Sequence, residues 1–239
     1  MFPVQLSRVP AALAVVALAA AAAGCSGGGG TAAQSANVSR AAPAHAASVY
    51  TAAQLRSALL TSVNGVRPVA PATAGPYGAL PGVTATKRSL SGVKITPAKC
   101  ANASGTGLSS GKFSQVPATV VTFRFAAVGA SEVLLAPPSS MLTAALSHQI
   151  PAGCSRYRAT IAGKTYTYRI RQGRAPKLGD AATELNVRAT GASTANIWTV
   201  IYRSRGLVGA VTLIGPRATK AAVEALTRLA YQHAQKSLA

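Results

Sequence analysis

Apolar and polar residues alternate along much of the second half of the chain, and this pattern predicts β-strands. In RYRATI and TYTYRIR every second side chain is apolar or aromatic, as in a strand with one buried face. These two segments open a run of five predicted strands, at residues 156–161, 165–171, 183–190, 197–205 and 207–215. Short connections at Gly163 and at Arg205–Gly206 favour antiparallel hairpins.

Three segments have the spacing of helices. Thr51 and Gln54 match a capping box, and the apolar residues that follow lie on one helical face. A second helix is predicted over 141–146, after a Pro-Pro-Ser-Ser stop. The third is predicted from about 217 to 238, with a stripe of alanine, valine and leucine.

The remaining segments complete a prediction of fold class. Residues 119–125 alternate as a half-buried strand, 93–95 form a short strand, and 66–90 are rich in proline and glycine and predict an extended loop. The sequence therefore predicts one α+β domain, with an antiparallel sheet of about five to six strands flanked by helices.

The first residues predict export. Residues 1–24 carry one charge and a short apolar run that ends in Ala-Ala-Gly before Cys25. This pattern is similar to a bacterial lipobox, in which the cysteine receives a diacylglyceryl group, although alanine stands where leucine is usual. Residues 25–47 are a Gly/Ala/Ser tether, so the domain spans 48–239. The alternative is an ordinary signal peptide in which Cys25 has no role.

With a lipid on Cys25, the protein is expected on the extracellular face of the cell membrane. The acyl chains attach it to the outer leaflet of the cytoplasmic membrane. The two other cysteines, Cys100 and Cys154, form an even pair in an oxidising compartment and predict a disulfide. A zinc site is not expected, because the three histidines are scattered and zinc needs four ligands at compact spacing.

The most informative feature of the composition is its large excess of positive charge. The chain has 24 Lys and Arg against 4 Asp and Glu, a net charge of +20. So few carboxylates exclude most carboxylate-pair chemistry and all-oxygen metal cages, and no cofactor is expected. Four residues are the predicted centre of a basic patch: Arg156, Arg158, Arg169 and Arg171. Strand alternation places each pair on one face, and neighbouring strands would merge them.

The basic patch has two interpretations. It is either the solvated surface of an arginine-rich protein or a contact surface for extracellular polyanions, such as anionic lipid headgroups or phosphate-bearing wall polymer. Nucleic acid fits the charge but not the export signal, so it is not an expected partner.

Three other residues are candidates for ligand contact. Tyr166 and Tyr168 share one strand face and either line a cleft or belong to the core. Asp180 is either a turn residue or a lone acid that anchors a ligand amine. Gly107 to Gly111 match G-x-S-x-G, but neither a buried strand before the serine nor a helix after it is predicted, so an enzyme is not expected.

The order of several motifs resembles a known group of proteins. These motifs are TAAQLRSALLT, Cys100, AGCSRY, KTYTYRIRQGRAPKLGDAATEL, IWTVIYRSRGLVGAVTL and the C-terminal Ala/Leu helix. Their order is similar to that of actinobacterial lipoproteins related to the extracellular sensor domain of the mycobacterial serine/threonine kinase PknH. The resemblance implies a sheet flanked by helices, a cleft suggested as a ligand site, and no established activity.

Two functions are therefore expected from the sequence. The first is a lipid-anchored ligand-binding or sensor-like module, which a cleft lined by tyrosines and apolar residues would favour. The second is a structural envelope protein that docks on anionic wall polymer or membrane, which a flat, continuous basic surface would favour.

Overall fold

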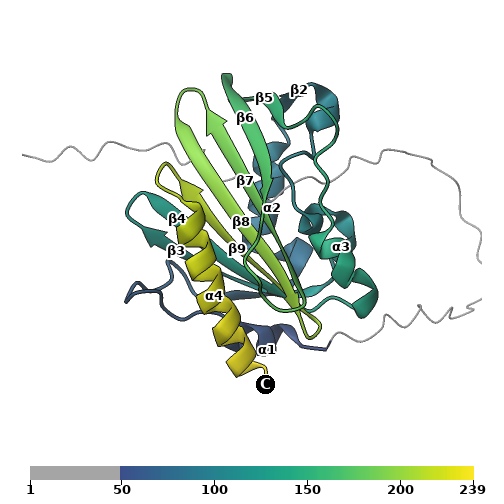
Figure 1. Ribbon diagram of the computed structural model, residues 1–239, viewed down its shortest axis with the longest axis vertical. Helices are drawn as coiled ribbons and strands as arrows, with labels where there is room; N and C mark the ends of the chain where they lie inside the picture. Colours follow the sequence, from purple (N-terminus) through teal and green to yellow (C-terminus); the bar gives the residue numbers. More distant parts are fainter. Residues whose placement is uncertain (1–48) are drawn as a thin grey trace, which may run out of the picture.

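Nine strands form one antiparallel sheet in the computed structural model, which describes residues 49–239. The strands are β1 (Thr73–Pro76), β2 (Lys94–Thr96), β3 (Pro117–Phe125), β4 (Val128–Leu135), β5 (Arg156–Ile161), β6 (Lys164–Gly173), β7 (Ala181–Thr190), β8 (Thr194–Ser204) and β9 (Leu207–Gly215). They lie side by side in the order β1-β3-β4-β9-β8-β7-β6-β5-β2 (Figure 1). The predicted signal peptide, the tether and Cys25 lie outside the described residues.

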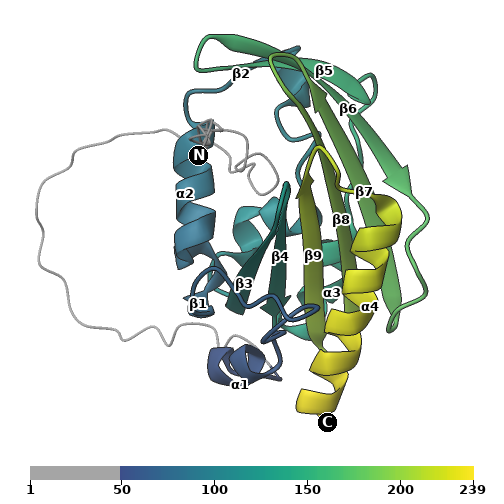
Figure 2. The ribbon, with the colours of Figure 1, turned by 90° about the vertical axis from the view of Figure 1, so that its left-hand side faces the viewer.

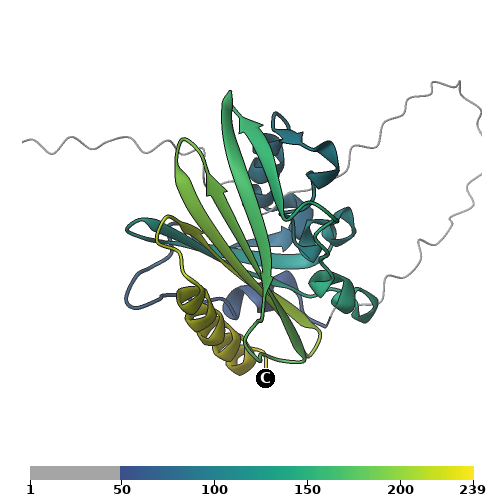
Figure 3. The ribbon, with the colours of Figure 1, turned by 45° about the horizontal axis from the view of Figure 1, so that its top comes forward.

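Helices cover the two faces of the sheet unequally. They are α1 (Ala52–Ser57), α2 (Pro81–Leu90), α3 (Leu142–Leu146) and α4 (Lys220–Ser237). Figure 2 shows α4 along one face of β8 and β9, and α2 and α3 on the opposite side of the sheet. On the face with α4, the strands β5, β6 and β7 extend beyond the helix (Figure 3). We call this uncovered part the open face.

The predicted helix cap at Thr51 and the two predicted hairpin turns are confirmed. The Thr51 side chain caps α1 and Gln54 completes the capping box. The β8–β9 hairpin turns at Arg205 and Gly206, both with positive φ, and the β5–β6 hairpin turns at Ala162 and Gly163, again with positive φ. Paired positive φ values suit the twist of two-residue hairpins.

Two predictions about the first half were wrong. The expected loop over 66–90 contains β1 and α2. Its prolines are compatible with both elements, because Pro81 begins α2, where a missing N–H costs nothing, and Pro76 ends an edge strand. The sheet also has more strands than the expected five to six, partly because β4 was missed. In β4 the charged Glu132 stands among buried apolar residues, so the segment lacks simple alternation.

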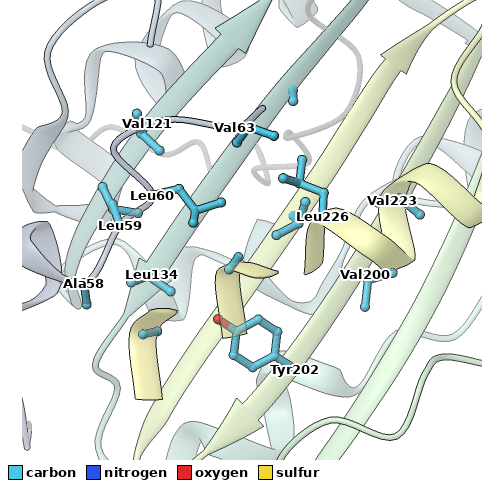
Figure 4. Close-up of a cluster of buried hydrophobic side chains, with 14 of the residues drawn as sticks. Ala58, Leu59, Leu60, Val63, Val121, Leu134, Val200, Tyr202, Val223 and Leu226 are labelled. Carbon is cyan, nitrogen blue, oxygen red and sulfur yellow. The ribbon is translucent and has the colours of Figure 1, made fainter. Parts of the chain in front are cut away.

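The core consists of three clusters on the two faces. On the α4 face, Val223 and Leu226 of the helix pack with Val200 and Tyr202 of β8. Figure 4 shows these side chains together with Leu60 and others from the segment after α1. The two remaining clusters lie on the opposite face, one under α2 and α3 and one behind β5 to β7. All three are formed within residues 49–239, so a fragment of residues 48–239 is expected to fold on its own.

The predicted disulfide is present. Cys100 and Cys154 are joined, with Cα atoms 5.3 Å apart. Both are fully buried beside the stacked rings of Tyr157 and Tyr168. The bond fastens the turn at 98–100 to the chain entering β5, behind the open face. A disulfide of this kind is typical of proteins that fold in oxidising compartments.

Candidate functional site

Register brings the predicted arginines to one side of the sheet. Arg156 lies opposite Arg169 across β5 and β6, and Arg169 lies opposite Arg188 across β6 and β7. Residues directly opposite one another point to the same face. Arg158 and Arg171, each two positions along its strand, share that face. The five exposed side chains form the basic surface of the open face.

No acid neutralises this surface. The ion pairs among residues 49–239 involve only Lys220, Arg228, Glu184 and Glu224. Of the four acids in the chain, Glu132 and Glu184 are buried. Like charges directly opposite in a sheet destabilise it. The row Arg156–Arg169–Arg188 therefore carries an electrostatic cost that a bound anion would relieve.

A cleft lies at the inner end of this row. It has a volume of about 350 Å³ and lies between β6, β7, β8 and the start of α4. Its lining is Arg169, Arg171, Asn186, Arg188, Asn196, Trp198, Ala218, Thr219 and Lys220. We call it the arginine cleft. Three guanidinium groups, two carboxamides and one indole thus meet around one volume.

Lys220 closes the cleft on the helix side. Its ammonium bonds to Glu184 and Glu224, the latter at 2.9 Å, and donates to the carbonyl of Arg174 at 2.9 Å. Burial alone would lower the pKa of Lys220, but the two carboxylates outweigh burial and raise that pKa. Because Lys220 is already paired, the free positive charge of the cleft belongs to the arginines.

The start of α4 adds a smaller positive field. Thr219 is the N-cap and its hydroxyl accepts from the N–H of Ala222 at 3.2 Å. The other N–H groups of the first turn have no partner within the helix, and the dipole of an 18-residue helix is positive at this end. This field reinforces the arginines and favours an anion in the cleft.

The two candidate tyrosines are not part of this site. Tyr166 and Tyr168 lie on the opposite face of β6, where they are 8% and 1% exposed. Tyr168 stacks on Tyr157 with ring centroids 5.1 Å apart. Burial first, and its tyrosine neighbours second, raise the pKa of Tyr168. These side chains pack in the core that supports the open face.

Asp180 lies at the other end of β7 from the basic surface. It precedes Ala181 and is eight residues from Arg188, or roughly 26 Å along an extended strand. Its N–H donates to the carbonyl of Arg203 at 2.9 Å. Among residues 49–239 its carboxylate makes no ion pair. The structure therefore does not bring Asp180 together with the arginines.

The structure does not bring the serine of the G-x-S-x-G match together with the histidine His233, as a hydrolase site would need. Ser109 ends a 3-10 turn that contacts α3, and its hydroxyl accepts from the N–H of Thr106 at 3.1 Å. His233 lies on α4, across the sheet. Within the described residues, no group of three His, Cys, Asp or Glu side chains is arranged to hold a metal. None of the helices described is long and apolar enough to cross a membrane.

Of the residues that line the cleft, the sequence selected only Arg169 and Arg171. Arg188 stands in a predicted strand, but only the β6–β7 register joins it to Arg169. Trp198 lies beside Asn186 across β7 and β8. Lys220 comes from α4, far along the chain, and no local pattern connects a helix start with these strands.

Comparisons with known proteins give structural matches only. No family model matches the sequence, and no curated protein matches it. The extracellular domain of PknH from Mycobacterium tuberculosis is similar, with a TM-score of 0.42 and 15% identity, over 61% of this chain and 77% of that one. An uncharacterised protein from Mycobacterium smegmatis, an orthologue of Rv0999, is similar with a TM-score of 0.37 and 16% identity, over 62% and 75%. The resemblance that the order of motifs indicated is therefore found in the structure, at low sequence identity.

Proposed function

We propose that this protein is a sensor-like, anion-binding module of the cell surface whose ligand occupies the arginine cleft. One observation carries the proposal: the row Arg156–Arg169–Arg188 is uncompensated and ends at a cleft of about 350 Å³. The lining contains no histidine, cysteine or carboxylate. Its one lysine, Lys220, is held by Glu184 and Glu224. This supports binding over catalysis, because the lining offers no free group for general acid–base or thiol chemistry.

The lining favours a phosphate-bearing ligand. Guanidinium groups present planar pairs of N–H donors that match phosphate oxygens, and such charge-assisted bonds are strong. The carboxamide nitrogens of Asn186 and Asn196 each donate to one carbonyl, at 3.2 and 3.4 Å, and each has a second N–H. Trp198 provides an apolar wall. The cleft therefore offers donors around an anion and one surface for the group attached to it.

The first prediction concerns small-anion affinity. In the fragment 48–239, changing Arg169, Arg171 and Arg188 to Gln should weaken pyrophosphate binding more than tenfold, because three charged donors are lost. The same variant should unfold at an equal or higher urea concentration, since the repulsion along the row is removed. Isothermal titration and urea unfolding measure the two effects. The matched control also removes three charges: Arg56, Lys87 and Arg88, exposed on α1 and α2, are changed to Gln together, and neither quantity should change.

Two results would contradict the cleft as the site. One is a triple variant that binds pyrophosphate like the parent. The other is an equal loss of affinity in the control with three changes on α1 and α2, which would indicate a general effect of net charge. Raising the salt concentration should weaken binding in the parent, since exposed charges are screened beyond about 8 Å at physiological ionic strength.

The second candidate function is docking on anionic wall polymer or membrane. The observation in its favour is that the basic surface continues past the cleft to Arg156 and Arg158 on β5. The same titrations separate the two functions. Two variants are compared: the double variant Arg156→Gln with Arg158→Gln, and the cleft triple variant. If the surface docks polymer as a whole, long-chain polyphosphate binding should fall equally in both. Pyrophosphate binding should then fall only in the cleft triple variant.

The anchor is a further part of the proposal. Cys25 follows a small-residue run and precedes a glycine tract, so we expect it to carry the lipid that holds the module at the membrane. Cys25→Ala in the full chain should move the protein out of the detergent phase or leave it uncleaved. Detergent-phase partitioning with Cys100→Ala as the control measures this. A Cys25→Ala protein that is cleaved as the parent is and still partitions into the detergent phase would contradict the anchor.

A further inference from the structure

We infer that the ligand is an anionic amphiphile, with its phosphate in the arginine cleft and an acyl chain in an apolar groove next to it. This inference rests on the proposed function and adds the second half of the site. The groove has a volume of about 390 Å³ and runs beside α4, on the side where β3 and β4 meet at their hairpin. Its apolar lining includes Phe125, Val128, Leu213, Ala222, Ala225 and Leu229.

The wall that α4 gives the groove is unusually apolar for an exposed helix surface. Ala222, Ala225 and Leu229 are all exposed, and they recur at the spacing of one helical face. Leu229 is 41% exposed, and within residues 49–239 it shares this property with only Val49 and Val69 among the large apolar side chains. Exposed apolar side chains around a concave surface mark a binding site more often than isolated ones do.

The groove and the arginine cleft are neighbours. Ala218 lines both. Trp198 of the cleft is also the cross-strand partner of Leu213 of the groove, on β8 and β9. Directly opposite residues on one face have Cβ atoms about 5 Å apart. The two cavities are separated only by the buried Ala218, so a ligand that fills both would cross the chain at the start of α4.

Charge decides which apolar molecule fits. A neutral chain would leave the arginine row unpaired, and an anion without a chain would leave the groove exposed to water. A phosphate with one alkyl or acyl chain satisfies both surfaces. Arg217, exposed at the groove, adds a further positive charge near the junction. The groove thus adjoins a cleft of matching chemistry across Ala218, and this favours a lipid-like ligand over a second protein surface.

The test compares probes that differ in one part, on the fragment 48–239. The probes are inorganic phosphate, dodecyl phosphate below its micelle concentration, and the neutral dodecyl maltoside. Because each buried methylene group strengthens binding about fourfold, dodecyl phosphate should bind at least a hundredfold more tightly than phosphate. Dodecyl maltoside should bind weakly, since it leaves the arginines unpaired.

Variants test whether the acyl chain binds in the groove and the phosphate in the arginine cleft. Ala225→Phe fills the groove and should reduce the gain from the chain at least tenfold, without affecting phosphate. Ala221→Phe, exposed on α4 but outside both linings, is the matched control and should bind both probes like the parent. Arg188→Gln should weaken both phosphate probes.

The outcomes separate this inference from the proposed function. If phosphate binds through Arg188 but the chain adds nothing, the inference is wrong and the anion site stands. If neither phosphate probe binds, both are wrong. Equal binding of dodecyl maltoside and dodecyl phosphate would also overturn the inference. So would a concentration-dependent dimer that Ala225→Phe dissociates, because the groove would then be covered by a second copy.

Discussion

Replacing Cys100 and Cys154 together by alanine is expected to lower the free energy of unfolding by at least about 4 kcal/mol. The disulfide closes a loop with a sequence separation of 54, and in the chain-entropy model a loop of this length restricts the unfolded chain by about that amount. Urea unfolding of the fragment 48–239 measures the loss.

The reduced parent protein provides the control for this prediction. It keeps both sulfur atoms in the buried cluster behind β5 and β6, so its loss of stability reports the cross-link alone, and the double variant adds the loss of packing. If the double variant unfolds at the same urea concentration as the oxidised parent, the bond contributes nothing to stability. Since the cluster supports the strands of the arginine row, the reduced protein should also bind pyrophosphate more weakly.

The second large effect is expected at Glu132, a buried acid with one partner. Its carboxylate accepts from the N–H of Leu60 at 3.0 Å, and its other oxygen has no partner among residues 49–239. Burial raises the pKa of Glu132 to about 7, against the opposing effect of the Leu60 hydrogen bond. Glu132 is 2% exposed, so little of the burial effect is screened by solvent.

The sign of the pH dependence follows from this raised pKa. Below about pH 4.5, the ordinary pKa of the side chain, the group is protonated in both the folded and the unfolded protein, and its burial carries no charge penalty. Between that pH and about 7 the unfolded chain releases the proton first, so stability falls as pH rises. The full penalty, about 3 kcal/mol, is reached above pH 7.

Glu132→Gln should therefore stabilise the protein by about 3 kcal/mol at pH 8 and by little at pH 4. Glutamine keeps an oxygen for the Leu60 N–H. The measurement is the difference in unfolding free energy between variant and parent across this pH range. The other titrating groups are the same in both proteins, so their contributions cancel in this difference. One of these is His148, whose pKa is lowered by burial against the hydrogen bond to Ala103, and which contributes with the opposite sign. Asp180→Asn, at an exposed acid, is the control. A difference that does not change with pH would show that Glu132 is ionised at no cost.

The two buried acids belong to one row of the sheet. Glu184 lies opposite Val200, Val200 opposite Val211, and Val211 opposite Glu132. Glu184 is paired with Lys220, but Glu132 has no cationic partner within residues 49–239. The protein thus removes half of its few negative charges from the surface. Because Glu184 is buried and paired with Lys220, it does not neutralise the arginines of the open face.

The sequence by itself determined those features whose cause is local. Alternation separated the arginines of β6 from Tyr166 and Tyr168, because successive side chains of a strand point to opposite faces. The Thr51 capping box and the turn at Arg205–Gly206 were likewise readable, since the residues concerned are three or fewer positions apart. Because Cys25 was assigned to the predicted lipobox, two cysteines remained, and the disulfide followed from counting them.

Only the tertiary structure decided which of these parts meet. Strand register, which depends on long-range pairing, joined Arg188 to Arg169 and placed Trp198 beside Asn186. The packing of α4 brought Lys220 to the same cleft and left the apolar groove beside it. Glu132 hid β4 because a charge inside an apolar run breaks the alternation that marks a strand, and its burial depends on partners more than seventy residues away. A cleft built from four separate elements has no pattern in the linear sequence, since its residues are neighbours only after the chain has folded.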